Sequence, residues 1–140
     1  MGNNVTVEES FENLNSFWTN LCEQASYCSP FLLPAWMETW WGVFGGDARL
    51  NIWVVRQNDT VIGIAPVQLI LDTAALIGRS DTCDYQDFLI VPGKEQDFFS
   101  LLLPEMTRAG IQYLDFPSVK ADSHVINTLV EIARSVGLQV

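Results

Sequence analysis

Residues 50–71 of the chain are LNIWVVRQNDTVIGIAPVQLIL, two apolar runs joined by a short polar stretch, and they decide the fold. The first run, Leu50 to Arg56, is apolar and rich in β-branched residues, which is typical of a strand. Asn58-Asp59 supplies a turn and Val61 to Leu71 a second strand, so the two runs predict a β-hairpin. Pro66 in the second run predicts a bulge or an edge position, because proline has no N–H for the ladder.

Two helices are predicted before this hairpin. The first is amphipathic, and a capping box at Thr6-Val7-Glu8-Glu9 would begin it. Its apolar side comprises Phe11, Leu14, Trp18, Leu21, Cys22 and Ala25. The second helix is predicted from Pro34, a residue favoured in the first turn, to Phe44, and Gly45-Gly46 would end it.

Strands and helices alternate after the hairpin. Pro104 should break or kink the helix predicted there, because a proline inside a helix removes a hydrogen bond. The predicted elements are a strand at Ala74–Ile77, a polar loop at Gly78–Thr82, a strand at Tyr85–Val91, a helix at Lys94–Ala109, a strand at Ile111–Phe116 and a helix from Asp122 or Ser123 to Gly137. This order predicts an α/β (α+β) fold over residues 1–140, a mixed sheet in one domain with helices on both faces.

The composition excludes several classes of function. Hydrophobic residues make up 49% of the chain, which excludes disorder as its main character. The net charge is −10 with only 7 Lys and Arg, so phosphate neutralisation and direct nucleic-acid binding are disfavoured. The same sign disfavours an anionic membrane surface. The sequence also lacks an apolar run of about 18 residues, the length that a membrane span needs.

Cysteine and histidine usage argues against a disulfide framework and a zinc site. The chain has 3 cysteines, Cys22, Cys28 and Cys83, without a CxxC pair, and 1 histidine. Met1 to Asn4 has neither the basic nor the apolar region of a signal peptide. These features predict a cytoplasmic protein without a bound metal.

Three stretches between about Ser29 and Ile90 carry a family resemblance. They are SPFLLPAW at residues 29–36 with Trp40-Trp41 following, VIGIAPV at 61–67, and LIG at 76–78 followed by DYQD at 84–87. Together they resemble CelD-like proteins, a branch of the GCN5-related N-acetyltransferase (GNAT) superfamily associated with cellulose biosynthesis. These proteins in turn resemble the Fem-type aminoacyl transferases, which have two tandem GNAT-like lobes.

The resemblance also implies where an acyl donor should bind. A GNAT lobe holds acyl-CoA at the loop after its fourth strand, where N–H groups at a helix N-terminus contact the pyrophosphate. Its pattern is Arg/Gln-x-x-Gly-x-Gly/Ala, whereas residues 90–97 here are IVPGKEQD, with a single glycine. Pro92 lacks an N–H, Glu95 and Asp97 add negative charge, and Lys94 can offset one charge only. We therefore expect no cofactor in this chain.

The tandem design implies a second lobe that binds acetyl-CoA or another acyl donor in the full-length protein. The last residues, Gly137-Leu138-Gln139-Val140, resemble a helix stop followed by the start of another strand. We therefore expect the chain to be the N-terminal lobe of a longer two-lobe protein.

The densest polar cluster near predicted strand ends is Asp81, Asp84, Tyr85 and Asp87. In a substrate pocket, the carboxylates would hold an amine or sugar hydroxyls and Tyr85 would donate a hydrogen bond. In a solvated loop, the aspartates would only cap turns. Both interpretations stay open. Asp87 alternates with Phe88, so one of the two should face outward.

Trp41 and Arg79 complete the candidate substrate-binding residues. Trp36 and Trp40 have the helical spacing of core residues, whereas Trp41 lies off that face and could contact a sugar or peptide. Arg79 could bind an anionic group, and an exposed surface charge is the plainer interpretation. The sequence identifies no catalytic residue.

Two functions follow from these expectations. The first is the N-terminal lobe of a GNAT-like N-acyltransferase, which recognises a small-molecule, sugar or peptide acceptor while the second lobe supplies the donor. The alternative is a non-catalytic binding or interaction module of degenerate GNAT fold. An incomplete last strand would also leave a sheet edge open for self-association.

Overall fold

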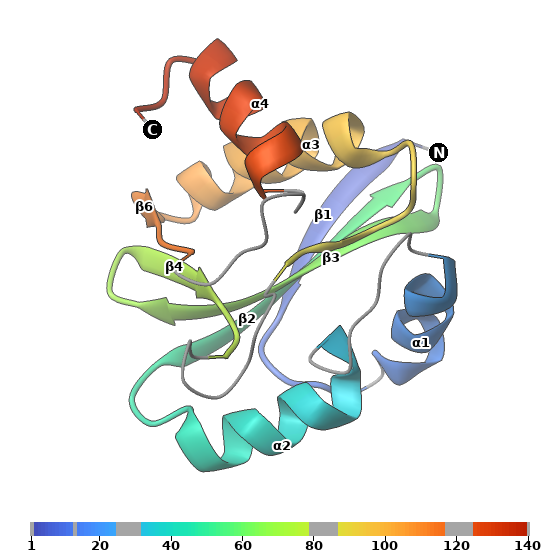
Figure 1. Cartoon of the computed structure of the whole chain (residues 1–140), viewed down its shortest axis with the longest axis vertical. Helices are drawn as coiled ribbons and strands as arrows, with labels where there is room; N and C mark the ends of the chain where they lie inside the picture. The colour runs from blue at the N-terminus through green and yellow to red at the C-terminus, as the bar shows by residue number, and fades with distance from the viewer. Residues whose placement is uncertain (1, 13, 25–31, 79–86, 117–124, 140) are drawn as a thin grey trace.

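The computed structural model of the protein describes residues 2–12, 14–24, 32–78, 87–116 and 125–139 (Figure 1). A mixed sheet lies at the centre, with helices on both of its faces. In chain order the elements are β1 (Asn3–Glu8), α1 (Asn15–Gln24), α2 (Pro34–Phe44), β2 (Arg49–Gln57), β3 (Thr60–Ile70), β4 (Thr73–Leu76), β5 (Leu89–Ile90), α3 (Glu95–Arg108), β6 (Tyr113–Leu114), a π-helical turn η2 (Val125–Leu129) and α4 (Val130–Ser135).

The strands form a meander that ends in a parallel pair. The order in the sheet is β1-β2-β3-β4-β6, and β5 pairs with β3 beside β4. The β1–β2, β2–β3, β3–β4 and β3–β5 pairs are antiparallel, whereas β4 and β6 are parallel. Helix α3 lies in the connection from β4 to β6, because two parallel strands need a crossover between them.

The predicted hairpin is the centre of this sheet. Asn58 and Asp59 have φ of 53° and 67°, the left-handed conformation that a tight hairpin turn between β2 and β3 requires. The pairing shifts register where Val55 is opposite Gly63 and Arg56 is opposite Val61. One extra residue, Ile62, therefore forms a β-bulge in β3.

Pro66 lies inside β3, and neither predicted explanation holds as stated, because the bulge is elsewhere and β3 is a central strand. The Pro66 carbonyl accepts a hydrogen bond from the Ile77 N–H at 2.9 Å. The nitrogen and the carbonyl of one strand residue point to the same side of the strand. The missing N–H therefore faces the place between β4 and β5, where β3 changes partner and the ladder is interrupted.

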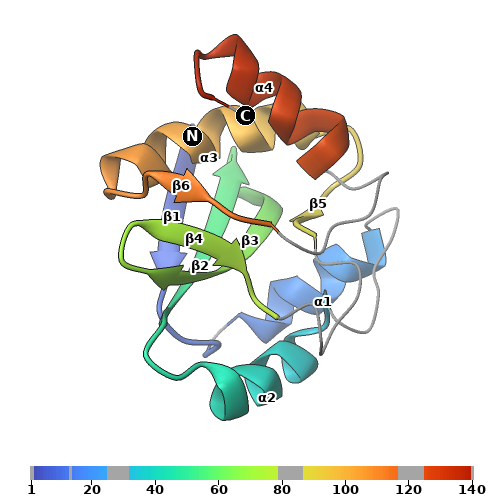
Figure 2. The same cartoon turned by 60° about the vertical axis from the view of Figure 1, so that its left-hand side comes forward.

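Two hydrophobic cores lie on opposite faces of the sheet. In both views α3 and α4 cover one face and α1 and α2 cover the other (Figures 1 and 2). On the α3 face, Phe88 makes edge contacts with Phe99 at 5.0 Å and with Phe116 at 5.5 Å between ring centroids. On the α1 face, Trp18 is completely buried and its Nε1 donates to the Leu32 carbonyl at 2.9 Å.

The apolar side predicted for the first helix is confirmed over the described residues. Phe11, Leu14, Trp18, Leu21 and Cys22 are all buried in the core of the α1 face. The capping box is wrong, because residues 3–8 form the strand β1. Its Val5 pairs with Val55, and the Thr6 hydroxyl accepts a hydrogen bond from Arg56 Nη1 at 3.1 Å. Pairing with β2 outweighs the local helix signal at Thr6.

Pro104 is also accommodated without a break. Helix α3 continues through it from Glu95 to Arg108, and Pro104 is exposed. The hydrogen bond that this residue cannot make therefore lies on the solvent side of the helix, where water can replace it. Gly110, with φ of 94°, ends the helix together with the bond from the Ile111 N–H to the Met106 carbonyl.

The last helix ends as predicted, at Gly137 with φ of 86° and a bond from the Leu138 N–H to the Ala133 carbonyl. Leu129 and Ala133 are buried, but Val136, predicted on the buried side, is 63% exposed. Leu138 and Gln139 form no strand. The predicted caps Asp122 and Ser123 lie outside the described residues.

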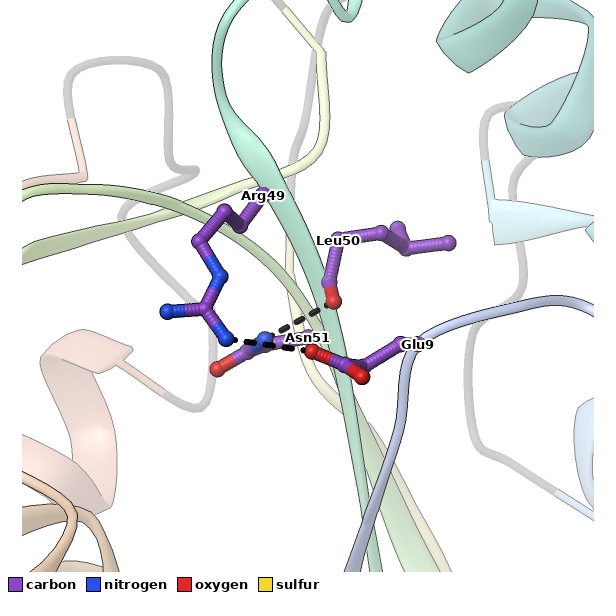
Figure 3. Close-up of polar contacts among 4 residues, drawn as sticks. All are labelled: Glu9, Arg49, Leu50 and Asn51. Atoms are coloured by element: carbon purple, nitrogen blue, oxygen red, sulfur yellow. Dashed lines mark hydrogen bonds and ion pairs between the residues drawn. The ribbon is translucent and has the colours of Figure 1, made fainter.

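An ion pair lies at the start of β2. Arg49 Nη2 reaches Glu9 Oε1 at 3.1 Å, and both side chains are about two-thirds exposed (Figure 3). Asn51 on the same strand is buried, and its Nδ2 donates to the Leu50 carbonyl at 2.7 Å. Exposed pairs of this kind add little to stability, so the ion pair has no large part in holding the fold together.

Within the described ranges, no helix is long and apolar enough to cross a membrane. Those ranges also contain no group of His, Cys, Asp and Glu side chains arranged to hold a metal ion. Cys22 is disulfide-bonded, which corrects the expectation drawn from cysteine usage. The other cysteines, Cys28 and Cys83, lie outside the described residues. In a reducing cytoplasm, the compartment that the sequence predicts, such a bond would be open.

Candidate functional site

Two of the predicted substrate-binding residues, Asp87 and Trp41, lie within the described residues, whereas Arg79, Asp81, Asp84 and Tyr85 lie outside them. Asp87 is half-buried, and its Oδ1 accepts a hydrogen bond from the Phe88 N–H at 2.8 Å. Phe88 itself is buried, as the alternation of the two residues predicts. Asp87 therefore places a carboxylate at the entrance to β5.

The chain on either side of residues 79–86 is fixed to β3. Before them, Gln68 Nε2 donates to the carbonyl oxygens of Leu76 and Gly78, each at 3.3 Å. After them, Leu89 pairs with Ile64. A single central strand therefore positions both ends of the segment that carries the predicted acceptor residues. The role of Gln68 has no signal in the sequence, because a glutamine in a strand has no preferred partner.

Trp41 packs on the α1 face of the sheet. It is half-buried against the core that contains Ile77 and Leu89, the residues before and after the 78–88 segment. A Cβ on Gly45 would lie 2.9 Å from Trp41 Cδ2, so the indole covers this glycine. Trp40 is buried as predicted, while Trp36 is only half-buried. Trp41 therefore packs against the same core as the two residues that flank the candidate segment.

The backbone N–H groups of Val91 and Lys94, between β5 and α3, donate to carbonyl groups of the same chain. The Val91 N–H donates to the Ile62 carbonyl at 2.9 Å, in continuation of the β3–β5 pairing. Pro92 has no N–H. The Lys94 N–H donates back to the Val91 carbonyl at 3.0 Å. The donors of these residues are thus used inside the chain.

The remaining N–H of this segment bonds to a side chain of α3. Gly93, with φ of 89°, directs its N–H to Glu95 Oε1 at 3.0 Å. The carboxylate therefore lies at the positive end of the α3 dipole, where a negative charge is favourable. Glu95 acts as an internal anion for the turn that precedes the helix.

The cation of this turn is also bound within the chain. Lys94 Nζ is 2.9 Å from Gln57 Oε1 at the end of β2. The other side-chain atom of the same amide, Gln57 Nε2, donates to Asp97 Oδ2 at 3.1 Å. The sequence contains no sign of this chain of bonds, because Gln57 lies in the hairpin, far from α3 in the chain.

A surface pocket of about 450 Å³ lies between the start of α3 and the last helix. Two of its lining residues, Glu95 and Glu131, are acidic, and Lys and Arg are absent from the lining. Its residues are Gly93, Glu95, Gln96, Asn127, Thr128, Glu131, Ile132 and Ser135. The pocket therefore presents negative charge beside the turn that Glu95 already occupies.

The antiparallel meander, the parallel β4–β6 pair and the helix α3 between β5 and β6 form the fold of the GNAT superfamily of acetyltransferases. One solved structure that shares it is the ribosomal-protein-S18-alanine N-acetyltransferase from Escherichia coli. Its TM-score is 0.56 at 18% identity, over 96% of this chain and 76% of that chain. Another is an aminoglycoside acetyltransferase from an uncultured soil metagenomic sample, in complex with sisomicin. Its TM-score is 0.51 at 13% identity, over 99% of this chain and 91% of that chain.

No family model and no curated protein matches the sequence. The structural likeness confirms the predicted mixed sheet and GNAT-like fold. The finer relation to CelD-like and Fem-type proteins, and with it the tandem second lobe, stays a prediction.

Proposed function

We propose that this chain is the acceptor-recognising lobe of a GNAT-like acyltransferase. The observation that carries the proposal is the fold, which matches two acetyltransferases over almost the whole chain. In a transfer from a CoA thioester the acceptor nitrogen or oxygen bonds to the carbonyl carbon, the C–S bond breaks, and the proton that the acceptor loses ends on the CoA thiol. An aminoacyl ester would break its C–O bond and leave a hydroxyl group in the same way. The donor would be a CoA thioester or an aminoacyl group bound by the second lobe. A cytoplasmic location is part of the same proposal, and it requires that the disulfide at Cys22 be reduced in the cell.

The charge of the chain favours an amine acceptor. The net charge of −10 attracts cations, and Asp87 presents a half-buried carboxylate at the start of β5. Asp81, Asp84 and Tyr85 precede it in the sequence and would add acceptor contacts, and Arg79 would bind an anionic group of the acceptor. Trp41 would contribute a partly exposed aromatic surface. These roles concern binding and orientation, and the base of the reaction is not assigned.

The structure also supplies an argument for the alternative function, a non-catalytic binding module. The Gly93 N–H is bonded to the Glu95 carboxylate, so the turn that would hold a donor is occupied from within. A lobe of this kind could recognise an amine, a sugar or a peptide without taking part in chemistry. Acceptor binding is common to both functions, and product formation separates them.

Acceptor binding can be measured by NMR titration of the chain with two amines, a peptide that begins with alanine and sisomicin. We expect saturable shifts of the Asp87 backbone amide and the Gln68 side-chain amide. Asp87→Asn retains an oxygen that can accept the Phe88 N–H but removes the charge. It should weaken binding by about tenfold or more, as the loss of one charged hydrogen bond implies.

Asp59→Asn is the matched control, because it removes one charge at the exposed hairpin turn, where asparagine tolerates a positive φ. Equal weakening by both variants would reduce the effect to net charge and contradict a site at Asp87. No saturable shift with either amine would refute the recognition of an amine acceptor at Asp87. Acetylated product, found by mass spectrometry when acetyl-CoA is added to this chain alone, would refute the division of roles between two lobes.

A further inference from the structure

The turn before α3 can be compared with what an acyl-CoA pyrophosphate requires. The resemblance to GNAT proteins puts that group at residues 91–97, where consecutive N–H groups should converge on it. Here the N–H groups of Val91, Gly93 and Lys94 all have partners inside the chain, and Pro92 has none to offer. Residues 91–94 therefore have no free backbone N–H to offer a pyrophosphate.

The charges around the turn do not fit one either. The first N–H groups of a helix have no intrahelical partner, and in α3 they belong to the turn that carries Glu95 and Asp97. A phosphate group that approached them would meet the Glu95 carboxylate already in place and Glu131 across the pocket. Lys94, the one cation of this turn, is turned toward Gln57 on the sheet.

We infer that the Glu95 carboxylate closes the N-terminal turn of α3 to phosphate groups, so that this chain does not hold a CoA donor at the usual place of the fold. The inference rests on the proposed function, since it states where in the acyltransferase the donor is not bound. Glu95 is a positioning residue of the turn. Any donor must then be held by other residues, such as those of a second lobe.

The internal bond can be tested first. Hydrogen exchange of the Gly93 amide should accelerate about tenfold in Glu95→Ala, which removes a charged hydrogen bond. Glu95→Gln, which retains an oxygen acceptor, should give a smaller acceleration. Glu131→Gln removes one charge from the same pocket while the Gly93–Glu95 hydrogen bond is kept, and it should leave the rate unchanged. Equal exchange in the wild type and Glu95→Ala would overturn the inference.

Phosphate affinity is the second test, by NMR titration with inorganic pyrophosphate and with CoA. In the wild type the amides of residues 93–97 should not saturate below about 1 mM, the limit of weak binding. Glu95→Ala should bind pyrophosphate at least about tenfold more tightly, because it frees one donor and removes one negative charge. If the Ala variant loses its dispersed spectrum, Glu95→Gln takes its place, with a gain of the same sign.

Saturation of the wild-type turn by CoA, or a Glu95 variant that binds no more tightly than the wild type, would overturn the inference. Both outcomes are distinguishable from failure of the proposed function. Failure of the proposed function would be a lack of amine binding, and it would be seen in the signals of Asp87 and Gln68, which do not belong to the turn before α3.

Discussion

The ring of Phe98 on α3 lies directly against the backbone of Gly63 on β3. A Cβ on Gly63 would be 2.3 Å from Phe98 Cδ1, 2.5 Å from its Cε1 and 3.1 Å from the Leu89 carbonyl oxygen. Only glycine allows this contact, which holds the first turns of α3 close to β3 and β5. The turn that Glu95 closes is therefore positioned by the core.

Gly63→Ala should destabilise the protein by about 1–3 kcal/mol, because the added methyl group overlaps a fully buried ring. Chemical denaturation measures the change in the free energy of unfolding. Gly42→Ala in α2 is the control, since a Cβ there meets nothing within 4 Å. It should stabilise the protein by about 0.5–1 kcal/mol. Equal effects of the two substitutions would show that the Phe98 contact does not constrain Gly63.

Two buried tryptophans allow the contribution of one hydrogen bond to the free energy of unfolding to be measured. Trp18 Nε1 donates to the Leu32 carbonyl, whereas the buried Nε1 of Trp53 has no hydrogen-bond partner among the described residues. Replacement by phenylalanine leaves a similar cavity at each position. Trp18→Phe should cost about 1 kcal/mol more than Trp53→Phe, because only the first leaves a carbonyl without its donor. Thermal or urea unfolding of both variants measures this difference, and equal costs would contradict it.

Pro104→Ala should stabilise the protein by about 1–2 kcal/mol. It restores a helix hydrogen bond in the middle of α3, and this gain exceeds the entropy that proline removes from the unfolded chain. The residue is exposed, so no packing is lost. Urea unfolding measures the gain. A loss of stability in Pro104→Ala would mean that proline shapes the native helix.

The hairpin at residues 49–70 could be predicted because its apolar runs and its Asn58-Asp59 turn are local signals. The apolar side of α1 could be predicted for the same reason, since helical periodicity lies within one segment. The strand β1 could not, because only pairing with β2 decides between a strand and a helix cap at Thr6. Pro66 shows the same limit. β3 can contain a residue without an N–H there only because Pro66 lies between the part of β3 that pairs with β4 and the part that pairs with β5.

The candidate site could likewise be predicted only in part from the sequence. Residues 90–97 contain a single glycine and two carboxylates, and this composition already predicts a poor pyrophosphate site. The contacts that specify it, from Gly93 to Glu95 and from Lys94 to Gln57, depend on side-chain geometry and on a strand about 40 residues away. The anchoring of the candidate acceptor segment by Gln68 depends in the same way on tertiary pairing, which no local pattern in the sequence encodes.

Gln68→Leu tests whether the segment anchored by β3 carries the acceptor site. The change removes both bonds from Gln68 Nε2, to Leu76 and to Gly78, while it retains a side chain of similar length. It should cost about 1 kcal/mol of stability. It should also weaken amine binding more than the exposed control Gln112→Leu does, because the segment loses its fixed start. NMR titration with the two amines measures binding, and unfolding in urea measures stability. A folded Gln68→Leu protein with unchanged amine affinity would move the acceptor site away from this segment and leave Trp41 as the remaining candidate on α2.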